Sequence, residues 1–326
     1  MQNTYNDSLI SQRSLPEVEV LLATYNGERY LKEFLESLSQ QEGVTIHLSV
    51  SDDGSTDRTL EVIRSFQSNF KTIQILSGPK KGPAQNFLSL IKQAKAEIIA
   101  LADQDDVWLP NHLYDSLHRI QSHSNDVAVL SICKVLEFAG SEDFRTPWPK
   151  SNFEIIFPNI LYENVGRGCT MVFNKKMASI VVQSDFEFAI MHDWWILLLA
   201  SLYGEVSYTN EYEILYRIHP NNFIGNPHKS VKSLFANAIR NKLGRPRYLQ
   251  MVSLDMQPLE HLRIYKRSRE LSEWLNLVNS GFFKRILIFD KRFVLRSDRL
   301  ENYLMKIAIL FFETVNNTPK FGRTNK

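Results

Sequence analysis

The chain has 326 residues, of which 44% are hydrophobic and 23% charged, a composition typical of a globular protein with one large or two smaller domains. Its two cysteines, Cys133 and Cys169, exclude a disulfide framework, and its first residues do not resemble a signal peptide. The longest apolar runs, residues 194–203 and 307–312, are shorter than the ~20 residues that span a bilayer. We therefore expect a cytoplasmic protein without a transmembrane helix.

The net charge of +2 is unevenly distributed along the chain. Residues 1–225 hold 18 Lys and Arg against 28 Asp and Glu, whereas residues 226–326 hold 20 against 8. An acidic body followed by a basic part predicts two regions with different partners, the second being anionic. A solvated helical surface is the alternative interpretation of the basic part, and composition alone does not separate the two.

Short β-branched runs alternate with amphipathic stretches over the first hundred residues. We predict strands at 18–22, 45–50, 72–76 and 97–102, and helices at 28–41, 58–66 and 84–95. Strands that alternate with helices indicate βαβ units, and therefore an α/β fold with a mainly parallel sheet covered on both faces.

Polar loops follow three of these strands, with the sequences "ATYNGE", "SDDGSTD" and "ADQDDVW". In such sheets ligands bind outside the carboxyl ends of the strands, so the three loops are expected to converge. Two of them are acidic, and carboxylates at this density repel one another unless a cation lies among them. Asp103 and Asp105, in the pattern Asp-x-Asp, would suit Mg²⁺ or Mn²⁺. Capping of a helix that begins near Pro110 is the alternative.

These loops resemble the motifs of family 2 of the glycosyltransferases, which are nucleotide-sugar enzymes with the GT-A fold. The matching stretches are "LLATYNGERYL" (21–31), "SVSDDGSTDRTLEV" (49–62) and "ALADQDDVWLP" (100–110). Within the family, "GCTMVFN", "HDWW" and "YRIHPNN" resemble signatures of bacterial rhamnosyltransferases. The resemblance covers about 200 residues and implies a GT-A fold for them; the last 100 residues carry no motif of this kind.

The end of the first predicted strand is a candidate nucleotide site, formed by Thr24, Tyr25 and Asn26. A tyrosine ring there can stack on a nucleobase while backbone groups hold the ribose. The second loop adds Asp52 and Asp53, and a carboxylate can accept the imide N–H of uracil or thymine. The resemblance favours Asp53 as the base contact, and the alternative is that these carboxylates only shape the turn.

Within "DQDD", the resemblance places Asp105 on the metal and Asp103 near the ribose or the metal. Asp106 is a third candidate, for contact with the diphosphate or the sugar. The cation would act as a Lewis acid, bridging the diphosphate oxygens as the bond to the anomeric carbon breaks.

Glycosyl transfer also needs a base for the acceptor hydroxyl. Asp193 opens a strongly apolar predicted helix, where partial desolvation would make it a better base, and it matches the catalytic Asp of the family. His192 stands where Glu is commoner, which leaves its role open, and Trp194 is placed beside the sugar. A carboxylate favoured only by the helix dipole is the alternative for Asp193.

Three further stretches supply candidates. Arg217 and His219 would lie on one face if this segment is a strand, where both can hold diphosphate oxygens and His219 can also bind the metal. A purely structural role is the alternative for each. Arg167 and Gly168 are expected beside the sugar, and Cys169 is assigned to the core.

After Asn226 the alternation of strands and helices stops, and the remainder is predicted to be helical. Charged pairs recur every seven residues with apolar residues between them: Lys284/Arg285, Lys291/Arg292 and Asp298/Arg299, and Phe282, Phe283, Ile286, Phe289, Phe293 and Leu300. A mostly basic stripe opposite an apolar face predicts contact with an anionic membrane, and packing against the catalytic domain is the alternative. No nucleic-acid motif accompanies the charge.

Together these features predict a flexible N-terminus (1–15), a GT-A catalytic domain (16–225) and a helical basic C-terminal extension (226–326). The expected activity is metal-dependent, inverting transfer of a sugar from a UDP- or dTDP-sugar to a hydroxyl of a glycan or lipid-linked acceptor. A Mg²⁺-dependent nucleotidyltransferase and a non-catalytic nucleotide-sugar binding module are the two alternatives. The absence of a Gln-x-x-Arg-Trp motif argues against a processive synthase.

Overall fold

The computed structural model describes residues 14–139, 143–148, 158–184, 186, 189–220, 265–290, 293, 295 and 299–310. The predicted flexible N-terminus and the predicted boundary near residue 225 therefore lie almost wholly outside the described residues.

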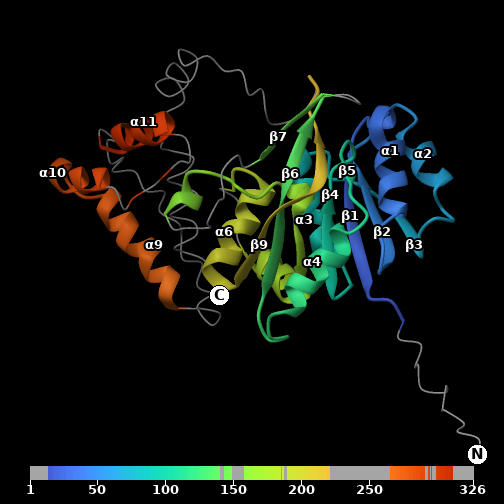
Figure 1. Ribbon diagram of the computed structural model, residues 1–326, viewed down its shortest axis with the longest axis horizontal. Helices are drawn as coiled ribbons and strands as arrows, with labels where there is room; N and C mark the ends of the chain where they lie inside the picture. Colours follow the sequence, from blue (N-terminus) through green and yellow to red (C-terminus); the bar gives the residue numbers. More distant parts are fainter. Residues whose placement is uncertain are drawn as a thin grey trace, which may run out of the picture.

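The first part of the fold is a parallel sheet of four strands joined by helices (Figure 1). Its elements are β1 (Glu17–Thr24), α1 (Glu28–Ser39), β2 (Thr45–Asp52), α2 (Thr59–Ser65), β3 (Thr72–Ser77), α3 (Pro83–Gln93) and β4 (Ile98–Ala102). β1 lies between β2 and β4, and β3 follows β2 at the edge, with every pairing parallel. The predicted elements are confirmed, with bounds that differ by at most two residues.

The second part extends the same sheet and makes it mixed. It contains β5 (Val107–Trp108), α4 (His112–Gln121), β6 (Val129–Phe138), β7 (Phe144–Trp148), the 3₁₀ turns η1 (Asn159–Leu161) and η2 (Gly168–Thr170), β8 (Val172–Asn174), α5 (Lys175–Gln183), α6 (His192–Tyr203) and β9 (Glu205–Arg217). The strand order is β3-β2-β1-β4-β8-β6-β9-β5, with β7 paired to β6. β8 is antiparallel to both β4 and β6, whereas β6 and β9 are parallel. The expected α/β class is confirmed.

Helices cover both faces of the sheet, and the alternation along β1 shows why. Val18, Val20 and Leu22 point into the core under α1, α2 and α4. Leu21 points into the opposite core, formed with α3, α5, α6 and α9 (Tyr265–Val278). Successive side chains of a strand face opposite sides of a sheet, so a strand that is apolar throughout must be buried on both.

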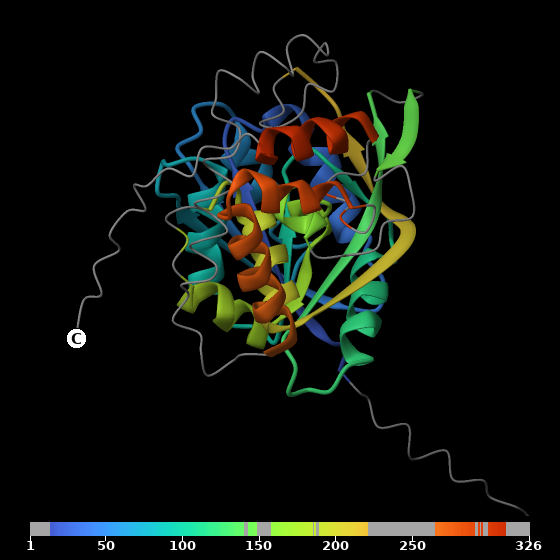
Figure 2. The same cartoon turned by 90° about the vertical axis from the view of Figure 1, so that its left-hand side faces the viewer.

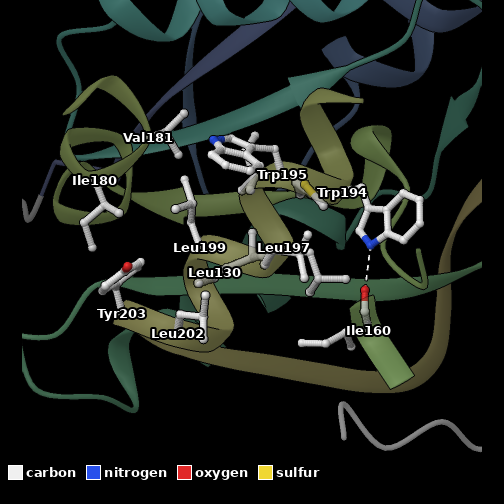
Figure 3. Close-up of a cluster of buried hydrophobic side chains, with 14 of the residues drawn as sticks. Leu130, Ile160, Ile180, Val181, Trp194, Trp195, Leu197, Leu199, Leu202 and Tyr203 are labelled. Carbon is white, nitrogen blue, oxygen red and sulfur yellow. Dashed lines mark hydrogen bonds between the residues drawn. The ribbon is translucent and has the colours of Figure 1, made fainter. Parts of the chain in front are cut away.

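Helix α6 is the centre of the second core, since all twelve of its residues are buried. Trp195 is fully buried, and its indole N–H donates to the Ser184 hydroxyl at 2.9 Å. Trp194 donates to the Ile160 carbonyl at 2.6 Å (Figure 3). A helix that is apolar on all sides belongs in an interior, and this one fills it. Within the described part of the chain, no helix is long and apolar enough to cross a membrane.

The described residues after 264 are helical, as predicted: α9, α10 (Phe282–Arg285), the 3₁₀ turn η4 (Ile286–Phe289) and α11 (Arg299–Leu310). They form a layer beside α6 (Figure 2). Trp274 of α9 is 4% exposed, and its indole N–H donates to the Tyr162 hydroxyl at 3.0 Å. The predicted basic stripe is wrong at Arg285, which is buried and donates to the Ile309 carbonyl at 3.1 Å.

Candidate active site

The first acidic loop, after β2, is built around the Asp52 carboxylate. Asp52 accepts hydrogen bonds from the Thr24 hydroxyl at 2.9 Å and from the amides of Gly54 and Ser55 at 3.0 and 2.8 Å. The Ser55 hydroxyl donates to the same carboxylate at 2.5 Å. Since Asp52 and Thr24 are both buried, their side chains shape the turn. The nucleotide contacts predicted for Thr24 and Asp52 stay predictions.

Asn26 joins this loop to the loop after β1. Its φ of 46° lies in the left-handed region, which asparagine tolerates better than most residues. The Asn26 amide donates to the Ser55 hydroxyl at 2.9 Å, and its side-chain oxygen accepts from the Thr56 amide at 2.9 Å. The Asn26 side chain is therefore engaged in linking two of the loops that were expected to converge.

Tyr25 is held between the first and third loops. Its amide donates to Oε1 of Gln104 and its carbonyl accepts from Nε2 of Gln104, each at 3.0 Å. This pair fixes the backbone, while the side chain is 58% exposed. An exposed ring on a fixed backbone is the arrangement that stacking on a nucleobase requires.

Asp53 lies beside the start of α3. Its carboxylate accepts from the amides of Lys80 and Gly82 at 3.0 and 3.1 Å, and Lys80 itself has a φ of 56°. Each carboxylate oxygen has a second lone pair, so both bonds leave acceptor capacity for a base. The base contact assigned to Asp53 stays a prediction.

The third loop meets the end of β9 at Asp105. The Nε2 atom of His219 lies 2.7 Å from Oδ2 of Asp105, and the Arg217 Nε donates to the Asp105 carbonyl at 2.8 Å. Arg217 and His219 were expected on one face if this segment is a strand, and that condition is not met at His219, because β9 ends at Arg217. Both side chains nonetheless reach Asp105. The His219 ring is also stacked on Tyr30, with 4.9 Å between ring centroids.

Arg217 is largely buried and holds the acidic loop in place. Its amide donates to Oδ1 of Asp106 at 3.0 Å, and its guanidinium pairs with Glu33 of α1 at 2.5 Å. The guanidinium also lies over the rings of Tyr30 and Phe138 at 4.8 and 4.5 Å. These contacts support the structural role that was the alternative for Arg217. Its predicted diphosphate contact remains untested.

The remaining two carboxylates of the loop are strongly perturbed. Burial, followed by the charges of Asp105 and Asp103, raises the pKa of Asp106 well above its usual range. Burial, then Asp105 and Asp193, raises the pKa of Asp103 to about 7, although Arg167 opposes the shift. Ligand atoms of Asp103, Asp106 and Cys169 lie within 4.8 Å of one another. Asp106 is fully buried, which favours its neutral form, whereas Asp103, with its pKa near 7, is poised to gain or lose a proton.

Asp193 lies in the first turn of α6, 9% exposed, with its Oδ1 accepting from the Trp194 amide at 2.6 Å. A Cβ atom on Gly168 would lie 3.7 Å from the Asp193 Cβ, and the thiol of the adjacent Cys169 lies within 4.8 Å of the Asp103 carboxylate. The charge of Asp193 contributes to raising the pKa of Asp103. The Trp194 ring turns away into the core, 6% exposed (Figure 3). Core packing already accounts for Trp194, so its sugar contact is a prediction without geometric support.

His192 and Gly168 lie against each other beside Asp193. A Cβ atom on Gly168 would come within 2.8 Å of Nε2 of His192, so only glycine fits without a shift. The His192 ring stacks on Phe87 with 4.3 Å between centroids, and neither ring nitrogen has a hydrogen-bond partner among the described residues. Burial lowers the pKa of His192, although Asp193 opposes this, so the ring is neutral near pH 7.

Arg167 is fixed by two contacts. Its guanidinium pairs with Glu137 at 2.6 Å and lies 3.8 Å from the ring centroid of Tyr216. It also lowers the pKa of Asp103, which places its positive charge beside the acidic loop. Cys169 is completely buried, and burial raises the pKa of its thiol well above its usual range, which agrees with the core role predicted for it.

A divalent metal fits part of the predicted ligand set. Asp105 and His219 offer one carboxylate and one imidazole from two segments, and Mg²⁺ or Mn²⁺ completes such a set with substrate phosphates. Asp103 does not form one compact cluster with both of them, and gathers instead with Asp106 and Cys169. A soft thiol at that second cluster does not suit these hard cations.

Three side chains of this site escaped the sequence analysis: Tyr30, Glu33 and Gln104. Tyr30, on α1, borders the site and stacks on His219. Glu33 lies three residues further along the same helix, which puts both on one side of it. In the sequence, the signal that could have identified Glu33 is its place as a polar residue beside the apolar stripe of α1.

The strand ends of this α/β sheet carry interlocked polar loops, a carboxylate–imidazole pair and a buried carboxylate at a helix start, which is where ligands bind in sheets of this class. Residues 19–180 match the model of the family described as Glycosyl transferase family 2. The chain thus carries a domain of that family, and it is a glycosyltransferase by class.

Named relatives agree with this assignment. The dTDP-rhamnosyl transferase RfbG of Shigella flexneri is 29% identical over 217 residues, 63% of this chain and 73% of RfbG. The poly(ribitol-phosphate) beta-N-acetylglucosaminyltransferase TarS of Staphylococcus aureus is 32% identical over 117 residues, 35% of this chain and 20% of TarS. The crystal structure of TarS residues 1–349 with UDP-GlcNAc aligns with a TM-score of 0.58 at 17% identity, over 89% of this chain and 79% of that one. The structural likeness confirms the fold.

Proposed function

We propose that this enzyme transfers a sugar from a UDP- or dTDP-sugar to a hydroxyl group of a glycan or lipid-linked saccharide, with inversion at the anomeric carbon. Surface polysaccharide assembly is the process in which we place it, and the cytoplasm is where we expect it to act. The names of RfbG and TarS, which specify a dTDP-rhamnosyl and an N-acetylglucosaminyl transferase, support a nucleotide-sugar donor.

One observation carries the proposal. Segments that are far apart in sequence meet at one end of the sheet, where His219 contacts Asp105. Gly168 lies against Asp193, and the thiol of the next residue, Cys169, lies within 4.8 Å of the Asp103 carboxylate. A carboxylate that accepts a proton and a carboxylate–imidazole pair that holds a cation are the two devices that the reaction needs. Neither alternative function accounts for Asp193 as well.

We assign the roles as follows. Asp193 takes the proton of the acceptor hydroxyl as that oxygen attacks the anomeric carbon from the side opposite the diphosphate. Asp105 and His219, with Asp103 near the ribose or the ion, would hold Mg²⁺ or Mn²⁺. A bound ion supplies positive charge to the departing nucleoside diphosphate. Arg167 beside the acidic loop adds a second positive charge there.

The donor base is assigned to the first two loops. The exposed Tyr25 ring stacks on it, and Asp53 accepts its imide N–H. The Asn26 side chain keeps the two loops at a fixed separation.

The test is a nucleotide-sugar panel with Mn²⁺. A donor that binds raises the melting temperature of the protein, and the same donor should then release its nucleoside diphosphate in the presence of an acceptor or, more slowly, water. Release of pyrophosphate instead would indicate a nucleotidyltransferase. Donor-induced stabilisation without any turnover, for every acceptor tried, would indicate a binding module.

A further inference from the structure

A compact apolar patch lies on the surface of α10 and η4. Four side chains within six consecutive residues are exposed: Phe282 by 41%, Phe283 by 86%, Ile286 by 46% and Leu287 by 58%. We call these four residues the α10 patch. No other four exposed large hydrophobic side chains of the described residues lie so close together in sequence, and a contiguous group of this kind marks an interaction site.

The opposite side of the same segment is firmly anchored. Ile288 is fully buried, and Arg285 is buried with its guanidinium donating to the Ile309 carbonyl of α11 at 3.1 Å. Phe289 packs edge-on against Tyr303, with 6.0 Å between centroids. One side of the segment is thus packed against α11. The α10 patch lies on the side of the segment that this packing leaves exposed to solvent. The buried Arg285 and Ile288 hold the backbone in that orientation.

The sequence around the α10 patch is basic. Residues 282–299 contain six Lys and Arg against two Asp, and of these Lys284, within the patch sequence, is exposed whereas Arg285 is buried. Basic residues around exposed aromatic and aliphatic side chains match an anionic lipid surface, whose headgroups attract the charges while the apolar groups enter the boundary below them. An apolar contact between two copies of the chain would have to bring these like charges together.

The position of the patch relates it to the site. In both Figure 1 and Figure 2, α10 and α11 lie in the upper half of the molecule, the half in which β1 reaches its carboxyl end. The acidic loops follow those strand ends. A surface bound through α10 would thus lie on the same half of the molecule as the site.

We propose that the α10 patch docks the enzyme on an anionic bilayer, with Phe282, Phe283, Ile286 and Leu287 in the headgroup–acyl boundary and Lys284 against lipid phosphates. The contact is peripheral and spans nothing. It concerns where the enzyme acts and does not depend on which sugar it transfers.

The experiment is cosedimentation of the full chain with two kinds of vesicle, phosphatidylcholine alone and phosphatidylcholine mixed with phosphatidylglycerol. The unmodified chain should bind the anionic vesicles at low salt and bind the neutral ones far less, and added salt should weaken binding. A Phe283→Ser/Leu287→Ser variant should lose on the order of a hundredfold in affinity, since each buried apolar side chain gives roughly tenfold. Lys284→Gln should give a smaller loss that disappears at high salt.

Val182→Ser is the matched control, because Val182 is 40% exposed on α5, away from the patch. It should bind vesicles like the unmodified chain. Circular dichroism and the melting temperature establish that each variant is folded. Turnover with a water-soluble acceptor should be unchanged in the Phe283→Ser/Leu287→Ser variant, so failure of the proposed reaction and failure of membrane docking are seen separately.

Three results would overturn the proposal. The first is that the unmodified chain does not bind anionic vesicles at low salt. The second is that the two serine substitutions leave vesicle binding unchanged. The third is that light scattering shows the unmodified chain as a dimer and the Phe283→Ser/Leu287→Ser variant as a monomer, because the patch would then join two copies.

Discussion

The imidazole of His219 and the carboxylate of Asp105 are in hydrogen-bond contact, 2.7 Å apart, although 114 positions separate them in sequence. The contact joins the segment that follows β9 to the loop that follows β4. Neither residue is strongly exposed, with 11% and 18% of the side chains accessible. A pair so placed is suited to take up a cation between them and a diphosphate.

Replacing Asp105 by Asn should abolish metal-dependent turnover and weaken donor binding in Mn²⁺, while the fold persists because crowding of like charges is relieved. Turnover and donor-induced melting shifts, each with and without Mn²⁺, measure this. Asp126→Asn is the control, since Asp126 is a surface carboxylate 96% exposed. Undiminished activity of the unmodified enzyme in EDTA would refute the metal site.

Asp193→Asn keeps the size of the side chain and removes its capacity to accept a proton. Turnover should fall by at least ~10², the typical contribution of a general base, with donor affinity nearly unchanged. Steady-state rates and donor titrations give the two quantities. Wild-type turnover in this variant would move the search for the base to another group.

Asp52 and Asp53 are neighbours with different expected roles. Asp52→Ala should lower the free energy of unfolding by about 1–3 kcal/mol, because it strands buried donors such as the Thr24 hydroxyl. Asp53→Ala should instead weaken donor binding by about tenfold and change stability less, since water can replace its bonds to the exposed Lys80 loop. Urea unfolding and donor titration separate the two. An equal profile for both variants would remove the distinction.

Gly168→Ala tests the tight contact with His192. The new Cβ would lie 2.8 Å from the imidazole Nε2 and 3.7 Å from the Asp193 Cβ, so His192 must shift. We expect about 1–3 kcal/mol of destabilisation and reduced turnover. The double variant Gly168→Ala/His192→Ala should recover stability relative to the sum of the two single changes. Strict additivity would show that the contact is not the cause.

A pH-dependent contribution to stability is expected from Glu213. It is 6% exposed and accepts from Arg119 at 2.6 and 2.8 Å and from His112 at 3.0 Å. Burial alone would raise its pKa, but these hydrogen bonds and charges outweigh burial and lower it below 4.5. A lowered pKa means that the ion pair stabilises the protein fully above about pH 4.5 and that this stability is lost as the pH falls through the folded-state value.

Glu213→Gln should therefore destabilise the protein by about 3–5 kcal/mol near neutral pH, because it leaves the Arg119 charge unpaired. Urea unfolding at about pH 7 and about pH 3.5 measures the difference between the two proteins. That difference should narrow at the acidic pH, and a constant difference would contradict the assignment.

The sequence predicts the first four strands well, because each is a continuous apolar run bounded by polar turns. It does not predict β8 and β5, since three and two residues carry no usable period. The sheet is mixed because β8, between β4 and β6, is antiparallel to both, and because β7 and β5 pair antiparallel with β6 and β9. Local pattern therefore fixes the strands that alternate with helices, and tertiary pairing fixes the rest.

The candidate site is predicted as a set of residues better than as a set of contacts. The carboxylates and His219 were found from strand ends and from resemblance, and the structure gathers most of them. The same information could not place Trp194 in the core or turn Tyr30 toward His219, because helix spacing alone does not say which neighbour a border residue meets. The Glu213–His112 contact spans 101 positions and leaves no local signal.

The bonds that Asn26 and Gln104 form between the three loops are made within the protein and need no donor group. Folding itself therefore orders these loops, and donor binding does not have to supply that conformational entropy. Substitution of Gln104 would then weaken donor affinity by loosening the loops. The affinity of this enzyme for its substrate can thus change at a position whose role is to hold the loops together.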